Sequence, residues 1–375
     1  LCVSMDTEND GQEPSICCPA LCDPRRSLHR FIALVFMCFL GFGSYFCYDN
    51  PGALQSRIKN DMNINTAQFA SLYAWYSWPN VFLCFVGGFL LDTVFGIRLG
   101  TVLFAFFVFF GQIIFAAGGL LNAFWLMEVG RFVFGIGGES LQVAQNTYAV
   151  SWFKGKELNM VFGLQMSFAR VGSTVNFNVM GPLYTYVHGF YHGYTCTGVV
   201  LMIASATCIL SLLCAVILAW LDRRADKVLK KSETQIGEVI RLSDVKDFPS
   251  TFWLLTLIGV TYYVAIYPFI SLGQVFFKRK FDLSPGGANA VNSLLYTISA
   301  VVSPFQGFLV DKTGRNISWV LFSIVGTIVA HIILTFTFWN PYIGVAFLGF
   351  FYSMLASALW PMAALMVPEH QLGTA

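Results

Sequence analysis

Ten apolar runs of about 20 residues dominate this sequence and constrain its fold more than any other feature. An apolar run of that length is sufficient for an α-helix to cross a bilayer. The runs are continuous and do not alternate between apolar and polar residues, which excludes a membrane β-barrel. The sequence therefore predicts an all-α polytopic membrane protein, whose ten spans cover residues 30–48, 67–91, 98–119, 122–150, 158–186, 196–221, 251–275, 287–310, 317–338 and 341–366.

The composition agrees with this class. Hydrophobic residues make up 56% of the chain and charged residues 11%, whereas soluble domains carry about 25% charged residues. The formal net charge is only +2, and no basic block with interleaved aromatic residues is present, so no nucleic-acid partner is expected. No nucleophile–base pair or metal-ligand spacing is found either. We therefore expect neither an enzyme nor a cofactor.

The distribution of Lys and Arg between the connecting segments indicates the orientation. With the N-terminus in the cytosol, fifteen basic residues lie in cytosolic segments and five on the opposite side, as the enrichment of positive charge in cytosolic loops predicts. The expected organisation is a cytosolic tail (1–29), a six-helix N-terminal bundle (30–221), a cytosolic linker that is helical in part (222–250) and a four-helix C-terminal bundle (251–375).

A short motif occurs twice, at positions 219 residues apart, each time after the second helix of its half. Internal repeats of this kind are typical of secondary transporters. Its glycines permit close helix packing, and its Asp can meet a helix N-terminus and hold one conformation closed. The alternative is a chance tight turn. The residues with this expected conformational role are Gly88, Asp92 and Arg98 in the first copy, and Gly307, Asp311, Gly314 and Arg315 in the second.

The double motif resembles the loop signature of the major facilitator superfamily. The second copy, GFLVDKTGR, matches the pattern GxxxDxxGR, whereas the first has one extra residue between Asp92 and Gly96. Arg131, in a segment that also carries Gly130 and Gly135, is similar to a second signature of the superfamily. The resemblance implies a major facilitator fold with a substrate site at mid-membrane depth. Because members have twelve helices, the chain is expected to lack the last two, which makes its C-terminal bundle incomplete.

A closer resemblance, to the lysosomal dipeptide transporters of this superfamily, covers nearly all of residues 20–375. It is carried by CYDNPGALQ (47–55), LYAWYSWPNV (72–81) and the segment 130–158. It implies a multi-pass lysosomal membrane protein that exports dipeptides by facilitated diffusion, as a uniporter working by alternating access. It also implies a glycosylated lysosomal membrane protein as accessory subunit. The lumenal loops carry no Asn-x-Ser/Thr sequon of their own, which agrees with a need for a glycosylated partner that shields them.

Two opposite charges, Glu139 and Arg170, lie in otherwise apolar or small-residue segments. A lone charge at a helix centre costs roughly 2.5–3.5 kcal/mol on insertion scales. Glu139 lies 15 residues before Lys154 and Arg170 lies 16 residues after it. In a helical hairpin that turns near Lys154, both lie about 22–24 Å from the turn and thus at nearly the same depth.

Two hypotheses explain this pair. Glu139 and Arg170 form an ion pair that locks two helices together, or they form a clamp for a zwitterion. The charged ends of an extended dipeptide are about 6–7 Å apart, so Glu139 would bind the ammonium and Arg170 the carboxylate. The resemblance favours the clamp. If Arg170 also holds Glu139 ionised, Glu139 is a poor proton carrier, which favours uniport.

Other polar and aromatic side chains are candidates for substrate contact or for structural roles. Arg131 is expected to be structural and paired with Glu128 at i, i+3. Tyr45 and Tyr48 end the first helix, where a gate role is a hypothesis. Mid-membrane amides serve equally as ligands or as hydrogen bonds between helices. The remaining substrate-binding candidates are Gln142, Asn146, Tyr262, Tyr263, Asn292, Tyr296 and Trp360.

Two alternative functions stay open at this stage. One is a non-transporting truncated form. The other is a major-facilitator carrier for another small solute, a sugar or an organic anion. An organic-anion site needs unbalanced positive charge, and the balance of Arg170 by Glu139 argues against it.

Overall fold

The computed structural model describes residues 27–153, 158–229 and 249–367, and within these ranges it contains helices and connecting turns but no strand. Ten helices have 21 residues or more. They are α1 (Ser27–Tyr48), α4 (Thr66–Leu90), α5 (Gly96–Leu120), α6 (Phe124–Trp152), α7 (Leu158–His188), α8 (Tyr194–Leu229), α9 (Ser250–Phe281), α10 (Pro285–Thr313), α11 (Asn316–Phe336) and α12 (Pro341–Met366).

The ten helices coincide with the ten predicted spans. Seven of them are long and apolar enough to cross a membrane among the residues that the structure describes. The other three are α4, α6 and α7, of which α6 and α7 carry the charged pair. Two helix ends were predicted wrongly, because α8 continues to Leu229 and not to residue 221, and α9 continues to Phe281 and not to residue 275. Residues 230–248 of the expected linker lie outside the described ranges.

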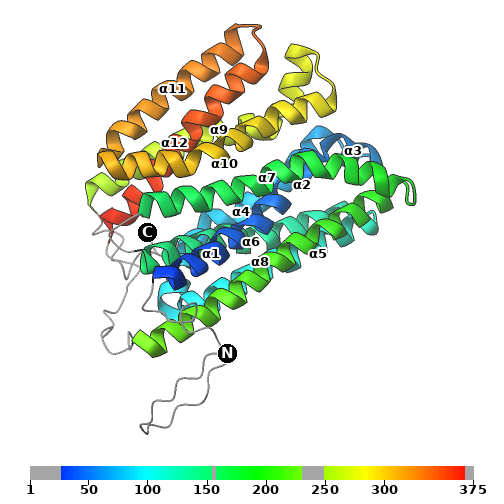
Figure 1. Cartoon of the computed structure of the whole chain (residues 1–375). Helices are drawn as coiled ribbons and strands as arrows, with labels where there is room; N and C mark the ends of the chain where they lie inside the picture. Colours follow the sequence, from blue (N-terminus) through cyan, green and yellow to red (C-terminus); the bar gives the residue numbers. More distant parts are fainter. Residues whose placement is uncertain (1–26, 154–157, 230–248, 368–375) are drawn as a thin grey trace, which may run out of the picture.

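The helices form two groups, with the sequence-early helices in one and α9 to α12 in the other (Figure 1). In the first group α5 packs on α6 and α8, while α1 packs on α7 and α8. In the second group α12 packs on α10 and α11. The two groups meet mainly where α7 runs beside α10, with α12 also touching α7. Any site between the halves is therefore bordered by α7 and α10.

Two short helices that the sequence did not predict lie after α1. They are α2 (Asn50–Ala53) and α3 (Gln55–Asp61), and they occupy one end of the bundle. We call this the α2–α3 end. The opposite end, where α7 begins and α10 finishes, is called the latch end.

Each copy of the repeated motif contains a glycine with positive φ. Gly96 and Gly314 both have positive φ, of 65° and 63°, a region that glycine enters without steric cost. The extra residue of the first copy falls in a π-helical turn, η1 (Leu91–Phe95), between α4 and α5. A π-turn accommodates a single inserted residue within a helix. The glycine turns of the two copies differ as well, because ψ is 163° at Gly96 and 19° at Gly314.

The contact between the halves depends on glycine at the latch end. A Cβ atom placed on Gly307 of α10 would lie 2.6 Å from the Asn159 carbonyl oxygen of α7, and one on Gly163 would lie 2.7 Å from the Ser303 carbonyl oxygen. Real Cβ atoms do not come this close to backbone oxygen. The two helices therefore approach each other only because these positions lack side chains.

We expect Gly307→Ala to destabilise the folded chain by about 1–3 kcal/mol, because overpacking a tight contact forces backbone shifts of that cost. The measurement is the midpoint of thermal unfolding of the purified protein. Gly286→Ala is the matched control on the same helix, since a Cβ there meets nothing within 4 Å. Equal midpoints for the two variants would contradict this account of the interface.

Candidate functional site

Glu139 lies on α6 and is held by a tyrosine of α4. The Tyr76 hydroxyl donates a hydrogen bond to Glu139 Oε1 over 2.8 Å. The close approach of the two helices depends on Gly138, where a Cβ atom would lie 2.8 Å from the same hydroxyl oxygen. Glu139 itself is half-buried and keeps part of its surface accessible. Its position is thus fixed by a side chain of the first half.

Arg170 lies on α7 and reaches across to the second half. It is only 3% exposed. Its Nη1 donates a hydrogen bond to the Ser299 hydroxyl of α10. Its guanidinium carbon lies 4.2 Å from the ring centroid of Tyr352 on α12, a geometry in which the cation is attracted to the ring face. Arg170 is therefore a first-half side chain whose contacts are made by the second half.

The ion-pair hypothesis for Glu139 and Arg170 is wrong in this geometry. Among the side chains that the structure describes, salt bridges within 4.0 Å are formed by Arg98 alone. Glu139 and Arg170 each have other partners, on opposite sides of the contact between the halves. The argument that Arg170 holds Glu139 ionised by direct pairing therefore loses its structural basis.

Tyr45 lies on α1 and contacts, through Gln142, the face of α6 that carries Glu139. It is close enough to Glu139 and Arg170 for both charges to act on its phenol. Its hydroxyl donates a hydrogen bond to Gln142 Oε1 over 2.9 Å, which places Gln142 one helical turn from Glu139 on the same face. Asn146, one turn further along, is half-buried. The amides predicted on this face thus extend a polar strip from Glu139.

The second half contributes a group of aromatic side chains around Arg170. Trp360 Nε1 donates a hydrogen bond to the Tyr263 hydroxyl over 3.0 Å. Tyr263 stacks on Tyr267 with ring centroids 5.2 Å apart and meets Tyr352 edge-on at 6.4 Å. Tyr263 and Trp360, which were both predicted as binding residues, belong to this group. Its aromatic faces and hydroxyl groups suit a polar ligand with apolar parts.

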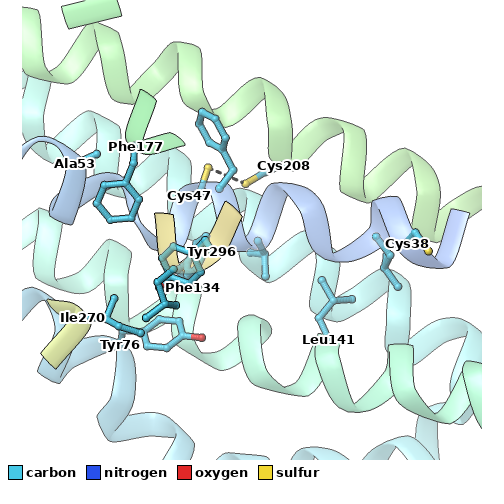
Figure 2. Close-up of a cluster of buried hydrophobic side chains, with 14 of the residues drawn as sticks. Cys38, Cys47, Ala53, Tyr76, Phe134, Leu141, Phe177, Cys208, Ile270 and Tyr296 are labelled. Carbon is cyan, nitrogen blue, oxygen red and sulfur yellow. Dashed lines mark hydrogen bonds between the residues drawn. The ribbon is translucent and has the colours of Figure 1, made fainter. Parts of the chain in front are cut away.

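Three other candidates from the second half lie in different surroundings. The Tyr262 hydroxyl forms a 2.9 Å hydrogen bond with Thr327 of α11. Asn292 donates to the Ile270 carbonyl oxygen over 3.0 Å. Tyr296 stacks on Phe177 of α7, with ring centroids 6.1 Å apart. Figure 2 shows Phe177 and Tyr296 close to each other, next to residues of the first half.

Four residues around the charged pair were not among the predicted binding residues. Tyr76 and Ser299 hold the two charges, and Tyr352 and Tyr267 complete the aromatic group. The segment LYAWYSWPNV contains Tyr76, but nothing in its spacing shows which of its aromatic residues faces Glu139. We call Tyr45, Tyr76, Glu139, Gln142 and Arg170, with the aromatic group, the central site.

Arg131 does not form the predicted pair with Glu128. The Ser71 hydroxyl of α4 donates to Glu128 over 2.5 Å, while Arg131 Nη2 donates to the Tyr48 carbonyl oxygen over 3.1 Å. Arg131 is 1% exposed, and its guanidinium carbon lies 4.6 Å from the Phe115 ring centroid. The side chain therefore faces the interior of the first half, away from its neighbour one turn earlier.

The second copy of the repeated motif joins the halves at the latch end. The Met160 backbone N–H, in the first turn of α7, donates to Asp311 Oδ2 over 2.9 Å, and the Asn159 amide donates to the other carboxylate oxygen. A carboxylate at a helix N-terminus is favoured by the helix dipole. Gly314 ends α10 in the left-handed region, and Arg315 is exposed.

The first copy is arranged differently. Arg98 Nε lies 2.6 Å from Asp222 Oδ2 and its Nη2 bonds to Asp226, both on α8. Trp152 Nε1 also donates to Asp222, over 3.0 Å. These contacts stay within the first half, so Arg98 braces α5 against α8. Gly88 lies in α4, and the side chain of Asp92 lies outside the described residues.

The central site has the chemistry to bind a small zwitterion. A carboxylate, a guanidinium, an amide and several phenols meet between the two halves. The guanidinium is a planar fork that binds carboxylates with two parallel hydrogen bonds. Two groups of apolar helices with polar side chains at their contact are the arrangement typical of secondary membrane transporters.

Comparison with known families identifies the class. The family model of the Major Facilitator Superfamily matches residues 37–375, and the chain belongs to this superfamily. This confirms the fold class predicted from the repeated motif.

Proteins named lysosomal dipeptide transporter MFSD1 are similar to this chain. The protein from Danio rerio is 62% identical over 372 residues, which span 99% of this chain and 81% of that protein. The protein from Homo sapiens is 63% identical over 359 residues, which span 95% of this chain and 77% of that protein. The closer resemblance seen in the sequence is thereby confirmed, and the chain is a multi-pass membrane transporter.

Solved structures share the fold. The proton:xylose symporter XylE has a TM-score of 0.70 with 15% sequence identity, covering 93% of this chain and 85% of that one. The E. coli fucose:proton symporter FucP has a TM-score of 0.68 with 12% identity, covering 92% of this chain and 87% of that one. At such low identity these structures establish the helical arrangement alone.

Proposed function

We propose that this transporter carries dipeptides out of the lysosome by alternating access. Glu139 binds the ammonium group of the dipeptide and Arg170 binds its carboxylate. The observation that carries the proposal is that the two charges do not neutralise each other, because each is held by a separate set of partners. The relatives that are named dipeptide transporters supply the substrate class.

Recognition through main-chain termini explains how one site accepts many dipeptides. Every dipeptide presents the same two end groups, which extended chains hold about 6–7 Å apart. Tyr45 and Gln142, which hydrogen bond to each other one helical turn from Glu139, are suited to hydrogen bond the single peptide group. The side chains of the dipeptide would then face the aromatic group of Tyr263, Tyr267 and Trp360.

Arg170 links binding to conformational change in this proposal. Its present contacts, Ser299 and Tyr352, belong to the second half. A substrate carboxylate that takes a bidentate position on Arg170 competes with these contacts. A ligand shifts a conformational equilibrium by its differential affinity for the two states, and exchange of contacts between the halves supplies such a difference.

The proposal includes an orientation, a location and a partner. We place the latch end in the cytosol and the α2–α3 end in the lysosomal lumen, following the distribution of basic residues. A glycosylated lysosomal membrane protein is the accessory subunit. Transport is uniport, which rests on the resemblance to facilitated carriers.

Flux of a labelled dipeptide into liposomes that contain the purified protein tests the function. We expect saturable uptake down the dipeptide gradient, with no accumulation above equilibrium when a pH gradient is imposed. Free amino acids, which carry the two charges closer together, should compete weakly. Absence of dipeptide flux, combined with flux of xylose or fucose, would replace the proposal by a sugar carrier.

A further inference from the structure

An acidic residue outside the central site lies buried between the halves at the α2–α3 end. Asp49 connects α1 to α2 and is 3% exposed. It lines a cavity of about 10 Å³, together with Gly52 of the first half and Gln274 and Asn292 of the second. Ile270 and Tyr296, two further lining residues from the second half, are labelled in Figure 2. Asp49 therefore lies where separation of the halves would open this end.

The Asp49 carboxylate is not fully paired by the described part of the chain. It occupies the N-cap position of α2 but makes no capping hydrogen bond. Its Oδ2 atom is buried without a hydrogen-bond partner among the described residues. Arg131 forms no salt bridge with it, since salt bridges there involve Arg98 alone. A cavity of this size holds about one water molecule, which is too little to hydrate an ionised carboxylate.

The neighbouring groups do not compensate the charge fully. Arg131 of α6 is the charged group that acts on Asp49. The titratable groups that face it from the other helices are the phenols of Tyr48 on α1, Tyr73 on α4, Tyr267 on α9 and Tyr296 on α10. From α7 comes the neutral hydroxyl of Ser173.

Burial dominates the balance at this position. It raises the pKa of Asp49 from the ordinary 3.8 to about 7, while the Ser173 hydroxyl and the Arg131 guanidinium act in the opposite direction. When the halves separate at this end, water reaches the carboxylate and the cause of the shift is removed. The two conformations therefore differ in proton affinity.

We propose that Asp49 is a proton-binding site of the gate at the α2–α3 end, neutral when the gate is closed and ionised when the gate is open. The opening and closing of this end, and its assignment to the lysosomal lumen, rest on the proposed function. The proton binds and leaves on the same side of the membrane. No proton is carried across, and the site is compatible with uniport.

The direction of the pH dependence follows from the difference in proton affinity. The closed gate binds the proton more tightly than the open gate, so closure is favoured at low pH. The stabilisation of the closed gate by the bound proton is complete below the ordinary pKa of an Asp. It is lost as pH rises through about 7. Between these limits the closed-to-open ratio changes by up to about tenfold for each pH unit.

The test measures the gate itself, in liposomes and without dipeptide. Fluorophores attached through noncanonical amino acids at the exposed positions Ala67 and Gly286, one in each half, report the separation at the α2–α3 end by energy transfer. For the wild-type chain we expect the closed-to-open ratio to fall at least tenfold between pH 5 and pH 8. Asp49→Asn, which resembles the neutral acid, should remain closed throughout this range.

Two further variants keep the test decisive. Asp282→Asn removes an exposed carboxylate at the same end and should retain the wild-type pH dependence. Ser173→Ala, which removes the nearby hydroxyl, should shift the midpoint to higher pH if Asp49→Asn does not fold. An unchanged pH dependence in Asp49→Asn, or an unshifted midpoint in Ser173→Ala, overturns the proposal. Because no dipeptide is present, these outcomes do not depend on the transported substrate.

Discussion

Replacement of Arg170 by Gln is expected to lower dipeptide flux by roughly 100-fold or more. Loss of one partner from a buried, hydrogen-bonded charge pair costs about 2–5 kcal/mol, and the substrate carboxylate would be left without its guanidinium. The variant also loses the interaction with Tyr352. Initial rates of labelled-dipeptide uptake into liposomes measure the effect.

Two other variants separate the chemistry of the guanidinium from charge in general. Arg170→Lys keeps the positive charge but loses the planar fork, so its flux should lie between those of the wild type and Arg170→Gln. Arg223→Gln removes an exposed arginine near the end of α8 and should leave flux unchanged. Wild-type flux in Arg170→Gln would rule out the proposed role of this residue.

The second large effect is expected for Glu139→Gln. Glutamine has nearly the same shape and can still accept the hydrogen bond from Tyr76, but it carries no charge for the substrate ammonium. Hydrogen bonds to charged groups contribute about 1.5–3 kcal/mol, so the affinity for dipeptides should fall roughly 10–100-fold. The measurement is the Kd of an unlabelled dipeptide by calorimetry, with folding checked by the unfolding midpoint.

Glu128→Gln is the matched control for this variant. Glu128 lies on the same helix, three turns closer to the α2–α3 end, and bonds to Ser71. Its replacement should leave the Kd near the wild-type value. If the two variants lose affinity equally, the effect of Glu139→Gln is structural and the assigned role is wrong.

The long helices could be predicted because hydrophobic length is a local property. Inside the bilayer each apolar run must satisfy its own backbone hydrogen bonds, which it does by forming a helix. The predicted spans 30–48 and 341–366 accordingly agree with α1 and α12. The end of α8 was missed because Asp222 and Asp226 appear as linker charges in the sequence. In the structure they bond to Arg98 of α5, which stabilises two further helical turns.

The position of the charged pair could be predicted, but its partners could not. Equal spacing from the hairpin turn is enough to place Glu139 and Arg170 at similar depth. Whether they touch depends on the rotation of α6 and α7 and on competing groups from other helices. Tyr76 is 63 residues from Glu139, and Ser299 is 129 residues from Arg170. The partner of Arg131 could not be predicted either. It is the backbone carbonyl oxygen of Tyr48, and every residue has such an oxygen, so the sequence does not single it out.

The most direct test of the central claim is calorimetric binding of one dipeptide in three forms: free, N-acetylated and C-amidated. For the wild type, blocking either end should weaken binding roughly 10–100-fold. In Glu139→Gln, N-acetylation should cause little further loss while C-amidation still does, and in Arg170→Gln the pattern should reverse. If each modification weakens binding equally in all three proteins, the two residues do not bind the ends of the dipeptide, and the account is contradicted.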